Sequence, residues 1–266
     1  ELGKYQKKKH IVMKDVNGQR TTKTHEVLKI WESHFKVHLN TRHPYQEEAM
    51  DSIPEKLPNA ENELNITADE IEKAIKTLKN RKAPGSDKVT AEVLKAGGDT
   101  MVKMLEKIFQ QILITEDTPS HFSKMLVTPV FKKGDSCKPE NYRPIALLSV
   151  PGKVLNKIFL EKIRVITERF TSNSQFGFRP NRGTVDAIFI VRQIIDKARE
   201  RVVILHFNFI DFISAFDTIW REALWKMLRA IGVNNKIVKI IENMYSKTLC
   251  SVVIDGYKTE WFEVLI

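Results

Sequence analysis

An α+β fold is predicted from three features of the sequence. First, several segments repeat apolar residues at three- and four-residue steps, which is the spacing of amphipathic helices. These helical segments are residues 24–39, 66–78, 91–114, 154–170, 187–195 and 216–231. Second, runs rich in β-branched and aromatic residues predict strands. The strand segments are residues 125–131, 141–150, 202–211, 249–254 and 261–266. Third, 42% hydrophobic residues in a chain of 266 can form a sizeable core, which excludes a disordered protein.

The first 65 residues are predicted to be a lead-in followed by a linker. Residues 1–23 are basic and contain an Asp15–Gly18 turn, which suggests a small hairpin. The helix at 24–39 places Val27, Leu28, Trp31 and Phe35 on one side. Residues 40–65 are rich in Pro, Asn and Glu, a composition typical of linkers, so we expect a boundary there.

The next section is predicted to be mainly helical. Thr67 and Glu70 have the spacing of a capping box, so a helix is expected to begin there. Lys82 precedes a Pro84-Gly85 turn. Gly97-Gly98 is expected to interrupt the following helix, and Pro119 to end the next one. The residues expected to face the core of the segment 101–114 are Met104, Leu105, Ile108, Phe109 and Ile112.

A basic strand–turn–strand follows. The strands MLVTPVF and NYRPIALLSV are joined by Lys132-Lys133-Gly134-Asp135, so Lys132, Lys133 and Arg143 are expected to face one polyanionic object. The alternative is a hairpin with ordinary surface cations.

The segment SQFGFRPNRGT, residues 174–184, alternates aromatic and arginine side chains that suit base stacking and phosphate contacts. Its alternative interpretation is a structured loop with two exposed arginines.

Asp211 lies at the end of the predicted buried strand 202–211, just before the helix that Gly232 is expected to end. A carboxylate in that position is costly to desolvate unless it meets a cation. The alternative is that Asp211 and Asp217 only cap the turn and the helix. Farther on, Asn234 is expected to cap a helix that runs through Tyr245.

The composition of the chain restricts the cellular compartment and the kinds of partner that we expect. No apolar run is long enough to span a bilayer, and no signal-peptide pattern follows Glu1, so neither a membrane partner nor secretion is supported. The two cysteines have no metal-site spacing, which favours a reducing intracellular setting without separating nucleus from cytoplasm. The net charge of +10 lies wholly in residues 71–200. It suits a polyanion partner, although a solvated basic surface is the other interpretation.

Six motifs occur in a recognisable order: WESHF, KAPGSD, VTPVFKKGD, NYRPIALLS, QFGFRPNR and IDFISAFD. Together they resemble the reverse transcriptase domain of LINE-type (non-LTR) retrotransposons, over a stretch from about Val27 to Phe262, with an RTE-like branch as our working hypothesis. The resemblance implies an incomplete right-hand polymerase. Its parts are an N-terminal lead-in (1–65), mainly helical fingers with a short β-hairpin (66–200), and a partial palm with an antiparallel sheet (201–266).

The resemblance also implies roles for single residues in RNA-directed DNA polymerisation, a nucleotidyl transfer that uses two Mg²⁺ ions. Asp211 corresponds to a catalytic magnesium ligand, Phe212 adds a backbone carbonyl, and Phe216 lies under the incoming sugar. Arg143, with Lys132 or Lys133, corresponds to the residues that bind the triphosphate of a dNTP. The residues matched to contacts with an RNA template and DNA primer are Lys82, Gln175, Phe178, Arg179 and Arg182.

Departures from the family pattern limit the expected activity. Both ends of the sequence look cut, and the paired-aspartate motif is absent, so the C-terminal palm, the thumb and an endonuclease domain are expected only in the parent protein. One carboxylate cannot hold two divalent ions, so we expect these residues alone to be inactive. The alternative function is a non-catalytic nucleic-acid-binding remnant of such an element. Lys88 stands where the family has glycine, and Ile213-Ser214 stands where a charged residue and a lysine are usual.

Overall fold

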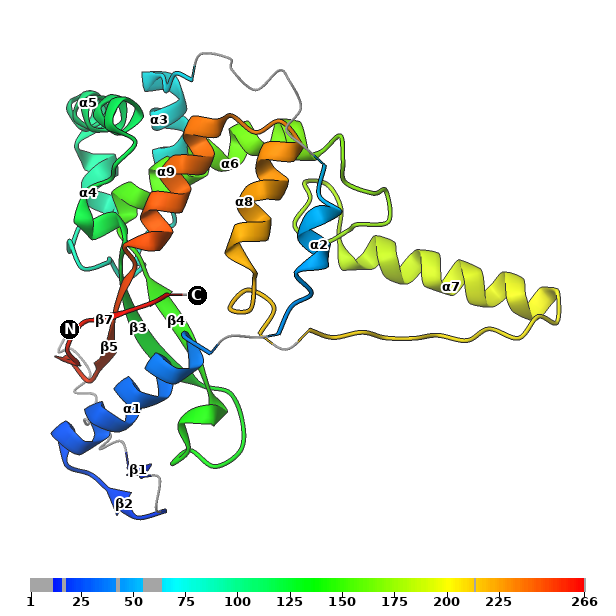
Figure 1. Ribbon diagram of the computed structural model, residues 1–266, viewed down its shortest axis with the longest axis horizontal. Helices are drawn as coiled ribbons and strands as arrows, with labels where there is room; N and C mark the ends of the chain where they lie inside the picture. The colour runs from blue at the N-terminus through cyan, green and yellow to red at the C-terminus, as the bar shows by residue number, and fades with distance from the viewer. Residues whose placement is uncertain (1–11, 16–17, 42–43, 55–63, 213, 266) are drawn as a thin grey trace, which may run out of the picture.

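A computed structural model of the protein describes residues 12–15, 18–41, 44–54, 64–212 and 214–265. Helices and one larger sheet make up most of this structure, which confirms the α+β class (Figure 1). The sheet has the order β4-β3-β5-β6, and β7 also pairs with β5. Its strands are β3 (Lys124–Phe131), β4 (Tyr142–Leu147), β5 (Leu249–Ile254), β6 (Tyr257–Lys258) and β7 (Phe262–Glu263).

The sheet is mixed. Within residues 201–266, β5 pairs antiparallel with β6 and β7, as predicted for that part, whereas its pairing with β3 is parallel. β3 and β4 form the expected antiparallel hairpin, but β3 also pairs with β5 in parallel, with Met125 opposite Cys250. A parallel pair needs a long crossover connection. The chain supplies one, because every helix from α6 to α9 lies between β4 and β5 in sequence.

A helical layer forms the larger core. Its helices are α3 (Ala68–Lys76), α4 (Ala91–Ala96), α5 (Gly98–Thr115), α6 (Val150–Thr167), α8 (Arg221–Ala230) and α9 (Asn235–Ser246). Phe109, Leu155 and Phe159 are almost completely buried in it. Two residues of α5 that were expected to face the core, Met104 and Ile108, are 54% and 38% exposed. The apolar stripe of α5 is wider than the face that packs, and Val102 and Leu113 fill that face instead.

A second core lies between helix α1 (Thr24–His38) and the sheet. Trp31 and Phe35 pack there with Val127, Cys250 and Val252. The expected N-terminal hairpin is present as β1 (Met13–Lys14) and β2 (Arg20–Thr21), paired antiparallel. The N-terminal helix is therefore fixed to the sheet by large buried side chains.

Local signals place most helix ends correctly. The capping box at Thr67 has both of its hydrogen bonds, and the Asn234 side chain accepts from the Lys236 N–H at 2.9 Å. Gly232 adopts φ +89° just after α8. The short helices are α2 (Glu48–Asp51), which lies inside the predicted linker, and the 3-10 turns η1 (Ser120–Phe122) and η2 (Pro139–Asn141).

An arm projects from the rest of the molecule. It consists of α7 (Thr184–Glu200) and the extended residues that return from its tip (Figure 1). The prediction of a buried strand at 202–211 was wrong, because these residues are exposed and belong to no strand. α7 likewise buries none of its apolar side chains, and Ile190, Val191 and Ile194 of the predicted helical segment 187–195 are exposed. The expected helix from Phe216 begins only at Arg221.

No described helix has the length and apolar character that crossing a membrane requires.

Candidate nucleotide and nucleic-acid interface

The β3–β4 hairpin has two different faces because side chains alternate along a strand. Tyr142 lies on the face that meets α1, and its ring contacts that of Trp31 edge-to-face at 4.8 Å between centroids. Arg143 is the next residue and is paired with Val130, so it lies on the opposite face. That face is open, since Arg143 is exposed and Val130 is 49% exposed. The local pairing thus directs the arginine away from the core.

Two more cations lie at the tip of this hairpin. Lys132 donates its backbone N–H to the Asn141 carbonyl at 2.8 Å, and Gly134 adopts φ +90°, which closes the turn. The side chains of Lys132 and Lys133 are exposed. Within the described ranges, neither lysine nor Arg143 forms an ion pair. We call these three residues the hairpin cations.

Asp135, in the same turn, is neutralised from another part of the chain. Lys14 of β1 donates to its carboxylate at 2.7 Å, and the Cys137 N–H donates at 2.9 Å. These contacts, with the Lys14 hydrogen bond as the largest effect, lower the pKa of Asp135 to about 2. Asp135 is therefore already paired with Lys14, and in the described structure it forms no ion pair with any of the hairpin cations.

The KAPGSD turn packs against the end of β4. A Cβ on Gly85 would lie 2.5 Å from the backbone of Leu148 and Ser149, so only glycine permits this approach. Lys82 is exposed at the entrance of the turn. Lys153, at the start of α6, is half-buried, and this burial lowers its pKa although the charge of Asp87 opposes the shift. Sequence reasoning missed Lys153, because no pattern around it signals partial burial.

The predicted nucleic-acid loop is held together by its own arginines. Arg179 forms an ion pair with Glu168 and donates to the Ser172 carbonyl at 2.8 Å. Arg182 donates to the Asn173 carbonyl at 2.8 Å. Gln175 donates to the Gly177 carbonyl at 3.1 Å. These three polar side chains of the predicted interface are thus engaged by the loop itself and by residues 168–173 just before it.

Phe178 is the exception in this loop, because its side chain is 91% exposed and its backbone has φ +61°. Its ring meets that of Phe216 edge-to-face, with 5.8 Å between centroids and an interplanar angle of 89°. Phe216 is itself 74% exposed. The structure therefore brings together two predicted site residues that lie far apart in the sequence.

Asp211 and Phe212 lie on the exposed return segment of the arm. No contact in the described part of the chain joins Asp211 to any of the hairpin cations. The neighbouring Asp217 does have a partner, since its carboxylate lies 3.6 Å from His38 Nε2 of α1. This contact between the WESHF helix and the aspartate motif had no signal in the sequence, because the two residues belong to distant segments.

The residues present do not complete a metal centre. In the portion that the structure describes, no group of three His, Cys, Asp or Glu side chains could hold an ion. Asp211 supplies one exposed carboxylate, whereas a two-metal site needs carboxylates on both sides of a pair of ions roughly 3.5–4 Å apart. The donor set on these residues therefore does not fit two divalent ions.

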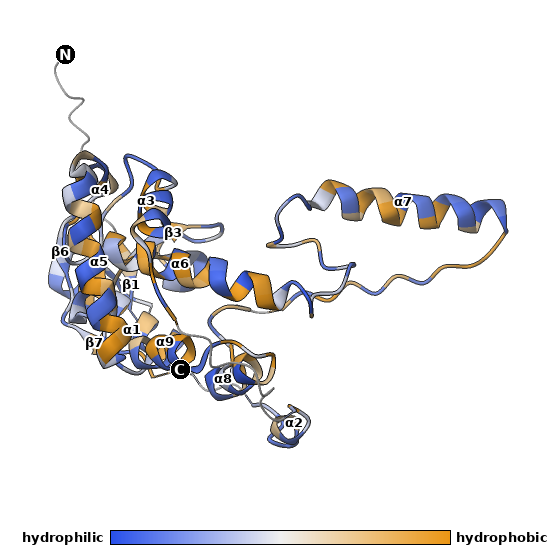
Figure 2. Cartoon of the chain, turned by 90° about the horizontal axis from the view of Figure 1, so that it is seen from above, coloured by the Kyte–Doolittle hydropathy of each residue, from blue (hydrophilic) through white to orange (hydrophobic). Residues whose placement is uncertain are grey.

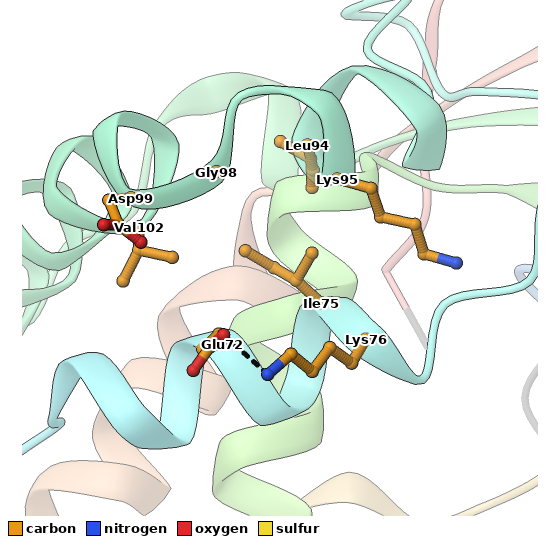
Figure 3. Close-up of a pocket in the computed structure, with 8 residues that line it drawn as sticks. All are labelled: Glu72, Ile75, Lys76, Leu94, Lys95, Gly98, Asp99 and Val102. Atoms are coloured by element: carbon orange, nitrogen blue, oxygen red, sulfur yellow. Dashed lines mark ion pairs between the residues drawn. The ribbon is translucent and has the colours of Figure 1, made fainter.

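A cavity between α3, α4 and α5 lies outside all of these motifs (Figure 3). Its lining includes Glu72 and Lys76, which form an ion pair at 2.6 Å, together with the apolar side chains of Ile75, Leu94 and Val102. None of the predicted site residues lines it. We therefore place the candidate interface on the hairpin and the Phe178–Phe216 surface.

Comparison with known proteins gives a consistent result. The family described as "Reverse transcriptase (RNA-dependent DNA polymerase)" matches residues 130–264. A "Probable RNA-directed DNA polymerase from transposon BS" of Drosophila melanogaster is 30% identical over 71% of this chain and 22% of its own length. The "Transposon TX1 uncharacterized 149 kDa protein" of Xenopus laevis is 26% identical over 79% of this chain and 16% of its own length.

A third relative matches this chain with a similar identity and coverage. It is the "Putative 115 kDa protein in type-1 retrotransposable element R1DM" of Drosophila melanogaster, 29% identical over 76% of this chain and 19% of its own length. The chain thus spans only between 16% and 22% of the length of these three relatives.

Proposed function

We propose, starting from the fact that this chain belongs to the reverse transcriptase (RNA-dependent DNA polymerase) family, that it supplies the nucleotide- and template-binding half of a retrotransposon polymerase. The transposable elements named for its relatives agree with the LINE-type assignment. The observation that carries the proposal is the set of hairpin cations, which are exposed and unpaired in the described structure. Guanidinium and ammonium groups in such an arrangement suit a triphosphate.

The proposed ligands follow from the positions of the hairpin cations and of the contact between Phe178 and Phe216. Arg143, with Lys132 or Lys133, binds the phosphates of a dNTP and offsets their charge. Phe216 lies beneath the sugar, and its contact with Phe178 supports a continuous surface for nucleotide and nucleic acid. Lys82, Gln175, Phe178, Arg179 and Arg182 are the proposed contacts with an RNA template and a DNA primer. Of these, the two arginines must first leave their contacts inside the loop.

Asp211 and the Phe212 carbonyl are the proposed Mg²⁺ ligands of the complete polymerase, where the ion would stabilise charge on the reacting phosphates. Because the described residues offer too few ligands, we propose that the 266-residue chain alone does not polymerise. The second palm carboxylates, the thumb and an endonuclease domain would then belong to a longer parent protein. We propose an intracellular location for it.

The division into a lead-in (1–65), fingers (66–200) and a partial palm (201–266) remains part of the proposal. Two packing features bear on it. α1 shares a core with the sheet, and α8 and α9 share the helical core with α3 and α6. Both cores therefore cross the proposed boundaries, which favours parts that fold together.

The phosphate-binding role can be tested with a matched pair of double variants. Lys133→Ala/Arg143→Ala is expected to weaken binding of a fluorescently labelled dNTP to the chain by roughly tenfold at low salt, and to reduce the salt dependence of that binding, because two contacts with the triphosphate are lost. Lys103→Ala/Lys107→Ala removes the same charge from the exposed side of α5 and is expected to change both quantities little. Fluorescence anisotropy over a salt series measures both. Equal losses in the two variants would contradict the proposed interface.

The alternative function is a non-catalytic nucleic-acid-binding protein derived from such an element. The incomplete donor set around Asp211 is the observation that favours it. It predicts salt-sensitive RNA binding that survives Asp211→Ala. Binding of a labelled dNTP separates the two functions, because the polymerase fragment uses the hairpin cations for a triphosphate, whereas the alternative requires only RNA binding. Extension of a primed template by this chain with Mg²⁺ would contradict both.

A further inference from the structure

The KAPGSD turn, residues 82–87, lies between two residues with a strained backbone. Arg81 has φ +57° and Lys88 has φ +59°. Residues with a Cβ rarely adopt this conformation, and it persists only where surrounding contacts hold it. Gly85 supplies one such contact, because its backbone packs directly against the backbone that follows β4. The turn is therefore fixed from outside as well as by its own sequence.

A second contact comes from His121 of η1. The Ser86 hydroxyl and His121 Nδ1 are hydrogen-bonded at 3.0 Å, although 35 residues separate them in the sequence. Within the ranges that the structure describes, no other residue of 82–88 forms a hydrogen bond with a side chain from a distant segment. The histidine thus provides a polar link between this turn and the rest of the molecule.

The backbone around His121 is a rigid support for that link. Phe122 is buried in the helical core, and a Cβ on Gly152 would lie 3.3 Å from its ring, so the ring packs directly on the first turn of α6. The Ser123 carbonyl accepts from the Leu249 N–H of the sheet at 3.0 Å. α6 has alternating apolar and polar residues along its length (Figure 2), as expected for a helix with one face in the core.

The chain between Ser86 and Lys82 is stiff. Ala83 precedes a proline, which restricts its backbone to extended conformations. Pro84 has a fixed φ, and Gly85 is buried with no room for movement towards β4. Because none of these three residues has much backbone freedom, the position of Ser86 determines where Lys82 lies.

We propose that His121 is a positioning residue, which acts through Ser86 to hold the turn so that Lys82 meets the phosphates of the RNA template. The inference rests on the proposed nucleic-acid contact of Lys82. His121 itself contacts no ligand, and its contribution is the place and the order of a lysine whose own side chain is exposed. A flexible lysine binds phosphate as a point charge, so a turn that orders it in advance lowers the entropy lost on binding.

A set of variants tests this role by the binding of a fluorescently labelled RNA template. Lys82→Ala is expected to weaken binding roughly fivefold and to reduce the salt slope by about one. His121→Ala is expected to weaken it roughly threefold, and Lys82→Ala/His121→Ala no more than Lys82→Ala alone, because positioning matters only while the lysine is present. His121→Asn should restore binding, since its amide can replace Nδ1 in the hydrogen bond with Ser86. Ser120→Ala, beside His121 in η1, is the matched control and should bind as the unchanged chain does.

Two further readouts separate positioning from a general loss of structure. Hydrogen exchange without RNA reports on the turn itself, because the Lys88 N–H donates to the Gly85 carbonyl and the Val89 N–H to the Asp87 carboxylate. Exchange of these two amides should be faster in His121→Ala than in the unchanged chain or in His121→Asn. Binding of a labelled dNTP should be the same in all of these variants, since the hairpin cations keep their places.

The outcomes distinguish this inference from the function on which it rests. Additive losses in Lys82→Ala/His121→Ala, no recovery in His121→Asn, or unchanged exchange in His121→Ala would each overturn the positioning role and leave the contact of Lys82 with RNA intact. An unchanged affinity of Lys82→Ala for RNA would instead contradict the proposed function of Lys82, and the inference with it.

Discussion

Residues with left-handed backbone conformations mark several of the motif loops. Lys88 has φ +59° and Phe178 has φ +61°. Residues with a Cβ are disfavoured in this region by steric contact with the backbone. The Lys88 N–H donates to the Gly85 carbonyl at 3.1 Å, so the turn that includes Gly85 requires this conformation. The lysine thus occupies a position whose geometry suits glycine.

Lys88→Gly is therefore expected to stabilise the fold. Removing the Cβ relieves about 1–2 kcal/mol of backbone strain, and the greater freedom of glycine in the unfolded chain offsets part of it. The free energy of unfolding should rise by about 0.5–1 kcal/mol, measured by urea denaturation. Lys88→Ala is the control, since it removes the charge but keeps the Cβ. An equal gain from alanine would assign the effect to charge.

The burial of Cys250 gives a second prediction for a single residue. Cys250 is 0% exposed in β5, and burial raises the pKa of its thiol to about 12, whereas Cys137 is partly exposed. Since the thiolate is the reactive form, alkylation at neutral pH should label Cys137 and spare Cys250 until the chain unfolds. Mass spectrometry with and without denaturant measures this, with Cys137→Ser as the control. Labelling of Cys250 in the folded Cys137→Ser chain would contradict its burial.

At the scale of elements, α3 shows how a local signal and a distant contact combine. Thr67 and Glu70 form the capping box, and Glu70 also accepts from Lys162 of α6 at 2.6 Å. Burial alone would raise the pKa of Glu70, but the hydrogen bonds from Lys162 and Thr67 lower it below its ordinary value. The start of α3 is thereby fixed both to its own backbone and to α6.

Thr67→Ala should destabilise the chain by about 1 kcal/mol, because the side chain that satisfies the Glu70 N–H is lost. Thr100→Ala, at an exposed position near the start of α5, is the matched control and should change stability little. Thermal or urea unfolding measures both variants. A loss no larger than that of Thr100→Ala would mean that the cap does not stabilise the start of α3.

At the scale of the whole molecule, contacts between distant segments join the N-terminal segment to the β3–β4 hairpin. Lys14 and Asp135 connect β1 to the β3–β4 turn, with 2.7 Å between their charged atoms. Trp31 connects α1 to β4 through Tyr142. The N-terminal segment therefore supports the hairpin that carries the hairpin cations.

Acid should weaken this support. Because the pKa of folded Asp135 is about 2, below its ordinary value of 3.8, the carboxylate adds stability above about pH 4, and this is lost as pH falls through about 2. The urea midpoint of the unchanged chain should exceed that of Asp135→Asn at pH 6, and the difference should shrink between pH 4 and pH 2. A difference that stays constant over this range would contradict the assigned ion pair.

Motifs predicted the residues of the candidate site, whose roles stay predictions, but they did not predict how these residues are arranged in space. The predicted strand–turn–strand put Arg143 on the returning strand and Lys132 and Lys133 in the turn before it, as the β3–β4 pairing has them. The Phe178–Phe216 contact and the His38–Asp217 pair join segments that no local pattern relates. The ion pair between Arg179 and Glu168 was also not predicted, because a sequence does not show which carboxylate a surface arginine contacts.

The sequence by itself determined the helices with clear caps, the β3–β4 hairpin and the family, because capping, turn formation and motif order depend on residues close together in the chain. Only the tertiary structure decided that β5 pairs with β3 in parallel and that residues 202–212 remain exposed. Strand propensity describes a residue's own preference, whereas a strand forms only when another strand lies beside it to accept its hydrogen bonds.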